Sequence, residues 1–188
     1  MTMVEGAGSR LRRQRKRASA LILVGTAFCL VLLAAGFWGS IRINGTASGA
    51  IGLWRIVPLT SRLQVGETIF VCLPRGKVME EARKRGYLRP GLCPGGVGPL
   101  IKTIVAVEGQ SVAVTDHLSI DGRVLAHSEL LAIDGRGRVL QRDSGGMVPK
   151  GKIYLHSPFT ASWDSRYFGP VPQSAVLGLA EEILTYAP

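Results

Sequence analysis

The stretch PLIKTIVAV (residues 99–107) decides the fold, because an apolar, β-branched run of this length is typical of a central β-strand. Strand alternation sorts its side chains onto two faces, one with Leu100, Lys102, Ile104 and Ala106 and the other with Ile101, Thr103, Val105 and Val107. Both faces are expected to be buried, and burying an ammonium group is unfavourable unless it is paired or loses its proton. Lys102 is therefore either a structural lysine, in an ion pair or reaching out to solvent, or a functional one.

The chain beyond residue 40 is predicted to be rich in strands and turns. Asp121 and Gly122 between two apolar runs favour a tight hairpin, and LAIDGRGRVLQ (131–141) indicates a weaker second one. Further strands are expected in GETIFVCLP (66–74), IKTIVAVEG (101–109), GKIYLHS (151–157) and AVLGLAEEILTYA (175–187).

One short helix interrupts this pattern. KVMEEARKRGYL (77–88) has helical spacing, and Gly86 is its expected end. The residues expected to face inward are Val78, Met79, Ala82 and Arg83. Turn-forming glycines and prolines follow in RPGLCPGGVGP (89–99). The sequence therefore predicts a mostly β domain with a short helical insertion.

Half of the positive charge lies at the N-terminus. Residues 1–17 carry six basic side chains and one acidic one, a net charge of +5, against +10 for the whole chain. The remaining charge is too dispersed for a phosphate-binding surface, and no aromatic residues alternate with it as in a nucleic-acid groove. We therefore expect the basic cluster to face a membrane and expect no nucleic-acid partner.

An uncharged stretch follows, ASALILVGTAFCLVLLAAGFW (18–38), which is long enough to cross the hydrocarbon core of a bilayer as a helix. Phe37 and Trp38 would lie at the interface, and the basic tail predicts a cytoplasmic N-terminus with the rest outside the cytoplasm. The alternative is a cleaved signal peptide, because GTASGA (45–50) has the small residues of a cleavage site. The apolar run is longer than the roughly 7 to 15 residues typical of such a peptide, which favours an uncleaved anchor.

The cysteines outside this stretch are Cys72 and Cys93. In an oxidising compartment, a disulfide closing a loop of about 20 residues would stabilise the fold by about 3 kcal/mol. Two unpaired thiols are the alternative. Cys29 lies in the apolar run, where it is expected to be only a small apolar residue. The histidines are scattered and do not cluster with cysteines, so no metal and no cofactor is expected.

A buried lysine can act as a general base, because desolvation lowers its pKa from about 10.4 toward neutrality. Such a base needs a nucleophile, which is commonly a serine. Ser48 in INGTASGAIGLWR (43–55) is flanked by Gly49 and Ala50, small residues that let a substrate backbone approach. A plain small-residue linker after the apolar run explains the same stretch.

A third stretch, HSPFTASWDSRYFGPVP (156–172), combines a possible ion pair with a hydroxyl. Asp164 and Arg166 can pair, and Ser162 lies two residues before them. By composition alone this is an ordered loop held by a salt bridge.

Taken in order, these three stretches resemble the boxes of membrane-bound signal peptidases with a Ser/Lys dyad, and more closely the TraF-type pilin-maturation branch of conjugative transfer. The lysine box matches LIKTIVAVEG (100–109), the final box S-x-D-S-R-Y-F-G-P is complete over 162–170, and 83–102 is similar to an insertion of the branch. The nucleophile box, N-x-[ST]-x-S-x-P-x-G-L-[YW], is matched at Asn44, Thr46, Ser48, Gly52, Leu53 and Trp54.

The resemblance implies a role for the matched residues. Ser48 would be the nucleophile that attacks the scissile carbonyl, and Lys102 the general base that takes its proton. The backbone N–H of Ser48 and the hydroxyl of Thr46 would form the oxyanion hole, where one missing donor costs about 3 kcal/mol in barrier.

Supporting roles and two departures complete this comparison. Ser162 would hydrogen-bond the lysine amine, and Asp164 and Arg166 would tie down the loop that carries Ser162. Ala50 stands where the pattern has proline, and Gln110 where it has aspartate. The missing proline should loosen the turn by less than about 1 kcal/mol.

For the whole chain, the resemblance implies a signal-peptidase-like coiled β-sheet as the catalytic domain (41–188), with a helical insertion at about 72–98 that a disulfide can close. A transmembrane anchor (18–40) and a basic cytoplasmic tail (1–17) would precede it. The expected protein is a single-pass serine endopeptidase of the bacterial inner membrane with its catalytic domain in the periplasm.

The branch points to an exported, membrane-associated precursor as substrate, above all a conjugative pilin subunit. Water or the substrate's own amine, which would give a ring, can resolve the acyl-enzyme. The expected partners are this substrate, the lipid bilayer and other components of conjugation or type IV secretion. Two alternatives stay open: a general type I signal peptidase that acts on many preproteins, and a non-catalytic conjugation assembly protein.

Overall fold

The computed structural model describes residues 3–186, without the side chains of residues 3–11, 32–33, 35 and 37–38. The chain divides between residues 41 and 42 into an N-terminal helical unit and a β-rich unit. Residue 187, the end of one predicted strand, lies outside the described residues.

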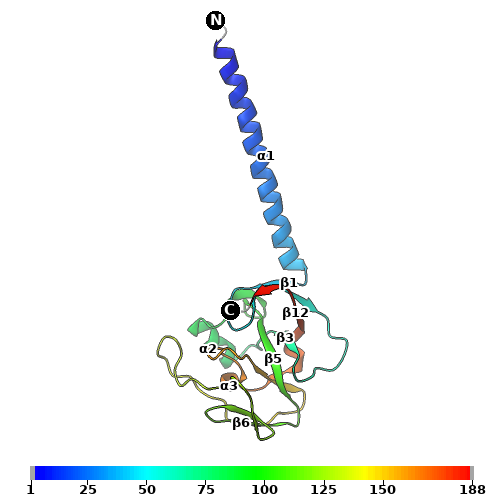
Figure 1. Cartoon of the computed structure of the whole chain (residues 1–188), viewed down its shortest axis with the longest axis vertical. Helices are drawn as coiled ribbons and strands as arrows, with labels where there is room; N and C mark the ends of the chain where they lie inside the picture. The colour runs from blue at the N-terminus through cyan, green and yellow to red at the C-terminus, as the bar shows by residue number, and fades with distance from the viewer. Residues whose placement is uncertain (1–2, 187–188) are drawn as a thin grey trace. The chain divides into compact units, whose positions relative to one another are not determined.

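In the N-terminal unit, a continuous helix, α1 (Met3–Trp38), includes residues 3–17 of the basic tail and the whole apolar run (Figure 1). Among the described residues, no helix combines the length and the apolar character that a membrane crossing requires. The side chains of Phe37 and Trp38, predicted at a membrane interface, are outside the described set. The anchor at 18–40 therefore stays a prediction.

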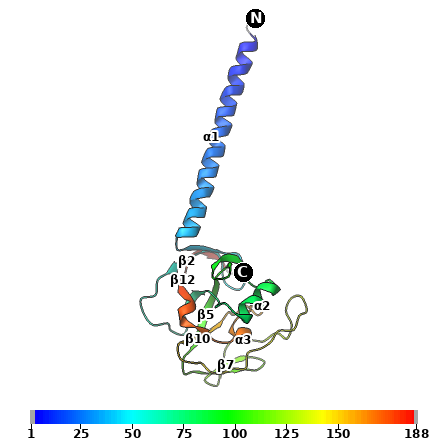
Figure 2. The same cartoon turned by 180° about the vertical axis from the view of Figure 1, so that it is seen from behind.

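The β-rich unit is built on a seven-stranded sheet in which β5 (Leu100–Val107) lies between β3 (Thr68–Val71) and β10 (Lys152–His156). Figure 1 labels β5 and β3, and Figure 2 labels β5 and β10. All of the pairings described in this sheet are antiparallel. In sheet order, the strands are β1 (Ile41–Asn44), β2 (Ile51–Val57), β12 (Val176–Tyr186), β3 (Thr68–Val71), β5 (Leu100–Val107), β10 (Lys152–His156) and β11 (Val171–Pro172).

A second sheet has four short strands in the order β8 (Arg123–Val124), β7 (Leu118–Ile120), β6 (Ser111–Val114) and β9 (Gly146–Met147). Asp121 and Gly122 join β7 to β8 with φ values of 49° and 78°, as a tight hairpin requires, so this predicted turn is confirmed. The weaker hairpin at 131–141 is reduced to one bridge between Ile133 and Val139. The prediction of a mostly β domain is confirmed.

A bulge in β5 corrects the predicted alternation of its faces. Two consecutive residues of β10, Leu155 and Tyr154, pair with Ile104 and Ala106, so that Val105 is extra in β5. Beyond this point the faces exchange. Ile104 packs into the larger core cluster and Ala106 into the smaller one, and the prediction that they share a face is wrong.

The helical insertion forms as α2 (Lys77–Arg85) and ends at Gly86, as predicted; Gly86 adopts a left-handed conformation with φ 77°. Met79 and Ala82 are buried, as predicted, whereas Val78 and Arg83 are exposed. The predicted inward stripe is too wide, because this short helix meets the core only along the line through Met79 and Ala82.

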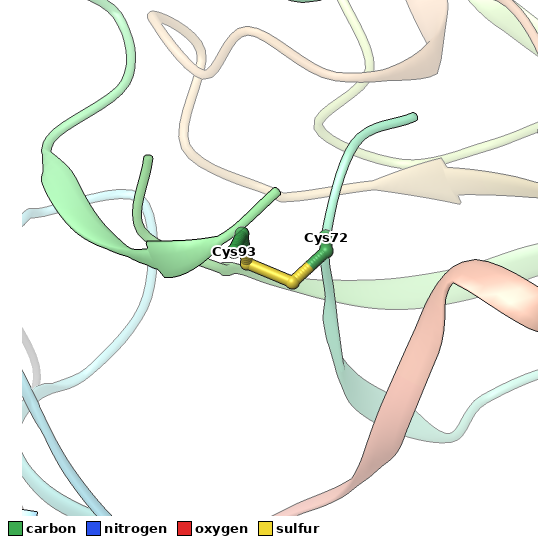
Figure 3. The surroundings of a disulfide bond; sticks show 2 residues. All are labelled: Cys72 and Cys93. Atoms are coloured by element: carbon green, nitrogen blue, oxygen red, sulfur yellow. A yellow bond between two sulfur atoms is a disulfide. The ribbon is translucent and has the colours of Figure 1, made fainter. Parts of the chain in front are cut away.

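Beyond α2, a disulfide between Cys72 and Cys93 closes the insertion (Figure 3). Cys72 follows β3 directly, and Cys93 ends β4 (Pro90–Cys93). Cys72 and Cys93 both belong to the larger core cluster, together with Met79 of α2. The disulfide therefore fastens the insertion to the main sheet through the core.

The close passage of β12 explains one glycine of the nucleophile box. Gly52 has a φ of 142°, and a methyl group on its Cα would lie 2.1 Å from the carbonyl oxygen of Leu184. Any side chain at position 52 would push β12 away from β2.

Removal of the disulfide should destabilise the β-rich unit. For the Cys72→Ala, Cys93→Ala double variant we expect the free energy of unfolding to fall by about 3 kcal/mol, because the unfolded chain gains the entropy of an open loop. Urea denaturation of the full chain in detergent micelles measures the change. Cys29→Ala, which removes an exposed free thiol, is the control. Equal unfolding midpoints for the two variants would contradict the expectation.

Candidate active site

Lys102 is the third residue of β5 and is only 3% exposed. Its amine donates a hydrogen bond of 2.6 Å to the hydroxyl of Ser162. Burial lowers the pKa of Lys102 from 10.5 to about 8; the negative charge of Asp164 opposes this shift and the positive charge of Arg166 adds to it. About a tenth of the amine is therefore unprotonated at pH 7 and about half at pH 8, far more than for an exposed lysine.

The loop that carries Ser162 is held by a buried ion pair. Asp164 and Arg166 are fully buried, and two guanidinium nitrogens of Arg166 donate to the two carboxylate oxygens of Asp164, each at 2.8 Å. Arg166 also donates to the carbonyl oxygens of Glu129 at 2.6 Å and of Ser162 at 3.1 Å. Asp164 precedes α3 (Ser165–Phe168) and caps it. Removing one partner of such a buried pair costs about 3 to 5 kcal/mol, so the pair strongly stabilises this arrangement of the loop.

Ser48 lies in the turn between β1 and β2. Its hydroxyl oxygen is 3.4 Å from the hydroxyl oxygen of Thr46. Its carbonyl oxygen accepts a hydrogen bond of 2.7 Å from the hydroxyl of Ser157, which follows β10 directly. The serine turn is thereby tied to the strand next to β5.

Ser157 connects the two halves of the site. Its hydroxyl holds the carbonyl of Ser48, and its backbone N–H donates to the carboxylate of Asp164 at 3.1 Å. A continuous path of hydrogen bonds thus runs from Ser48 to the loop that holds the amine of Lys102. Among the hydrogen bonds of the described residues, none joins the Ser48 hydroxyl directly to that amine, which is bound to Ser162 instead.

A buried imidazole lies close to this path. His156 is 4% exposed, and burial lowers its pKa to about 4, with the positive charges of Arg166 and Lys102 acting in the same direction. Within the described part of the chain, its Nε2 atom has no hydrogen-bond partner. His156 is therefore neutral at pH 7, which leaves Lys102 and Arg166 as the cationic groups around Asp164.

The two departures from the family pattern have structural substitutes. The carbonyl oxygen of Ala50 accepts from Asn44 and from the indole of Trp54, both at 2.9 Å, so hydrogen bonds hold the turn that lacks proline. Gln110 accepts from the backbone N–H of Val107 at 3.0 Å and donates to Asp121 at 2.8 Å. The turn after β5 is thus closed without the aspartate.

The sequence did not assign roles to Asn44 and Ser157. Asn44 was noted only as a matched position of the nucleophile box, and Ser157 only as part of the third stretch (156–172). The asparagine at a strand end before a small-residue turn was a usable signal, because asparagine commonly bonds to nearby backbone groups. Ser157 carried no such signal, because its partner Ser48 is 109 residues away in the chain.

The helical insertion borders the site. The ring of Tyr87 lies 5.4 Å from that of Trp163, which follows Ser162 in the chain. These three residues line one pocket of about 100 Å³ together with Leu131 and Tyr167. The insertion therefore shapes the surface beside the residue that holds the lysine amine.

Comparison with known proteins gives consistent matches over nearly the whole chain. The family model for signal peptidases, peptidase S26, matches residues 16–185. The conjugal transfer protein TraF of Agrobacterium tumefaciens is 50% identical over 175 residues, which cover 93% of this chain and 99% of that protein. The probable conjugal transfer protein TraF of Sinorhizobium fredii is 48% identical over 181 residues, 95% of this chain and 96% of that protein.

Among solved structures, a signal peptidase I from Enterococcus faecalis is similar over 63% of this chain and 97% of its own, with 22% identity and a TM-score of 0.39. The family match and the curated relatives confirm the predicted resemblance to signal peptidases and to TraF proteins. Since the match spans most of its length, the chain belongs to the signal peptidase family S26.

Proposed function

We propose that this chain is a serine endopeptidase in which Ser48 is the nucleophile and Lys102 the general base. The observation that carries the proposal is the buried amine of Lys102, with a pKa lowered to about 8 and a serine hydroxyl 2.6 Å away to orient it. An amine in this state can accept a proton near neutral pH, which an exposed lysine cannot. Membership of a peptidase family supports the same chemistry.

In the proposed reaction, the neutral amine of Lys102 takes the hydroxyl proton as Ser48 attacks the scissile carbonyl. The negative charge that develops on the carbonyl oxygen is stabilised by the backbone N–H of Ser48, with the Thr46 hydroxyl as a second donor. The protonated amine then gives its proton to the leaving nitrogen, and an acyl-enzyme ester remains. Water, or an amine of the substrate, attacks this ester and releases Ser48.

We propose further that residues 18–40 anchor the chain in the bacterial inner membrane, with the basic tail in the cytoplasm and the peptidase domain in the periplasm. The uncharged run and the basic cluster before it support this orientation. The Cys72–Cys93 disulfide is consistent with an oxidising compartment.

The proposed substrate is an exported precursor used in conjugation, most specifically a pilin subunit. Two relatives at 48% and 50% identity are named conjugal transfer proteins, which supports a role in this process. The insertion, which is similar to one of the TraF-type branch, favours a dedicated substrate over the many preproteins of a general signal peptidase, and it places Tyr87 in the pocket that Ser162 and Trp163 also line.

The pH dependence of cleavage tests the proposed base. Because Lys102 must be unprotonated, kcat/KM should rise about tenfold per pH unit below pH 8 and level off above it, with the midpoint near the pKa of about 8. Peptide cleavage by the full chain in detergent micelles gives the profile. Lys102→Arg should be inactive over the whole range, because a guanidinium group cannot deprotonate. An active Lys102→Arg variant would refute the assignment.

The same lysine should cost the protein stability. Between about pH 8 and 10.5 the unfolded amine is protonated and the folded one is not, so stability falls as the pH drops through this range. Below it, the full cost is about 3 kcal/mol. We expect Lys102→Met to be inactive and up to about 3 kcal/mol more stable at pH 7, with a smaller gain near pH 10. Urea denaturation of both proteins at both pH values measures the difference. If Lys102→Met is no more stable than the wild type at pH 7, the buried amine does not cost stability.

The substrate proposal predicts selective cleavage. A conjugative pilin precursor from the same plasmid or chromosome should be processed faster than several unrelated preproteins, and Ser48→Ala should abolish its processing. Mass spectrometry of the product distinguishes hydrolysis from ring formation, since a ring has lost one more water. Equal rates for all precursors would favour a general signal peptidase, and normal pilin maturation with Ser48→Ala would favour an assembly role.

A further inference from the structure

Asn44, the last residue of β1, makes hydrogen bonds along the whole turn that carries Ser48. Its Nδ2 atom lies within hydrogen-bond distance of the carbonyl oxygens of Thr46, Gly49 and Ala50, at 3.0, 3.1 and 2.9 Å, and because it carries two protons, one of them is shared between two carbonyls. Its Oδ1 atom accepts from the backbone N–H of Thr46 at 3.1 Å and from the hydroxyl of the same residue at 2.7 Å. One side chain thus holds the backbone on both sides of the serine.

These partners define the orientation of the Asn44 amide. Three carbonyl oxygens surround one end of it, so that end must be the NH₂ group, and the opposite end is an oxygen that can only accept. A threonine hydroxyl has one proton, and Thr46 therefore donates it to Asn44. The contact of 3.4 Å between the hydroxyls of Thr46 and Ser48 must then be made with the Ser48 proton.

We propose that Asn44 is a positioning residue for the nucleophile, acting through Thr46. It fixes the turn around Ser48 and directs the Ser48 hydroxyl toward the Thr46 oxygen in the resting site. This inference rests on the proposed function, in which Ser48 attacks the substrate. It also sets a condition on the oxyanion hole: the Thr46 hydroxyl can donate to the developing oxyanion only after it turns away from Asn44.

The position of Ala50 supports this role. A proline there would restrict the turn through its ring, and this chain has alanine instead. The Ala50 carbonyl is held by Asn44 and by Trp54, each at 2.9 Å. On the other side of the turn, Ser157 holds the Ser48 carbonyl. Of Asn44, Trp54 and Ser157, only Asn44 also accepts a hydrogen bond from the Thr46 hydroxyl, which lies next to the Ser48 hydroxyl.

Steady-state kinetics of the full chain in detergent micelles test the proposal. Asn44→Ala should lower kcat about 10- to 100-fold, because a misplaced nucleophile loses its near-attack geometry, while KM changes less than about twofold. The pH midpoint near 8 should stay unchanged, because Lys102 is not touched. Ile43→Ala, an 84% exposed neighbour on β1, is the matched control and should keep full activity.

The coupling to Thr46 separates positioning from mere support of the fold. If Asn44 acts through Thr46, the kcat loss of the Asn44→Ala, Thr46→Val double variant should be clearly smaller than the product of the two single losses. Multiplied losses, or an unchanged kcat in Asn44→Ala, would overturn the proposal. Urea denaturation at the assay temperature gives the unfolded fraction of Asn44→Ala without urea. An unfolded fraction large enough to account for the whole loss of kcat would overturn the proposal as well.

An activity-independent measurement keeps this proposal distinct from the proposed function. Hydrogen exchange at the Thr46 amide should be faster in Asn44→Ala than in the wild type and in Ile43→Ala, because the bond to Oδ1 is lost. Ser48→Ala in the same cleavage assay tests the nucleophile itself. If Ser48→Ala cleaves normally, the proposed function fails while exchange still reports whether Asn44 holds the turn; unchanged exchange would refute the Asn44 role alone.

Discussion

The buried ion pair between Asp164 and Arg166 is the interaction on which the geometry of the site depends. Its carboxylate holds the backbone of Ser157, which in turn holds the carbonyl of Ser48. Its guanidinium donates a hydrogen bond to the carbonyl oxygen of Ser162, and the hydroxyl of Ser162 accepts one from the Lys102 amine. One pair of opposite charges, removed from water, thus connects the nucleophile turn and the lysine through backbone contacts rather than by touching either functional group.

The lysine and the ion pair also depend on each other electrostatically. Arg166 adds to the desolvation that lowers the pKa of Lys102, and Asp164 partly opposes it. The two charges of the pair act in opposite directions, and burial is the main cause of the shift. A site of this kind needs a buried position for its base and, beside it, an ion pair with no net charge. The place of β5 between β3 and β10 provides the buried position.

Much of this arrangement was predictable, and the misses have local causes. The β-branched run at 99–107, the Asp121–Gly122 turn and the Gly86 helix end follow from backbone preferences that short segments express by themselves. The bulge at Val105 was not predictable, because it depends on how β10 aligns with β5. The role of Ser157 was missed for the same reason: its partner is distant in the chain. Periodicity identifies candidate strands and helices, but the register between them comes from packing.

That bulge has a consequence for the folding of the domain. Because the faces of β5 exchange at Val105, Ile104 contributes to the larger core cluster and Ala106 to the smaller one. A single strand then contributes side chains to both hydrophobic clusters, and neither cluster can unfold without exposing part of the other. The β-rich unit should accordingly lose its structure in one cooperative step, with the four-stranded sheet and the sheet that bears the lysine sharing a common transition temperature.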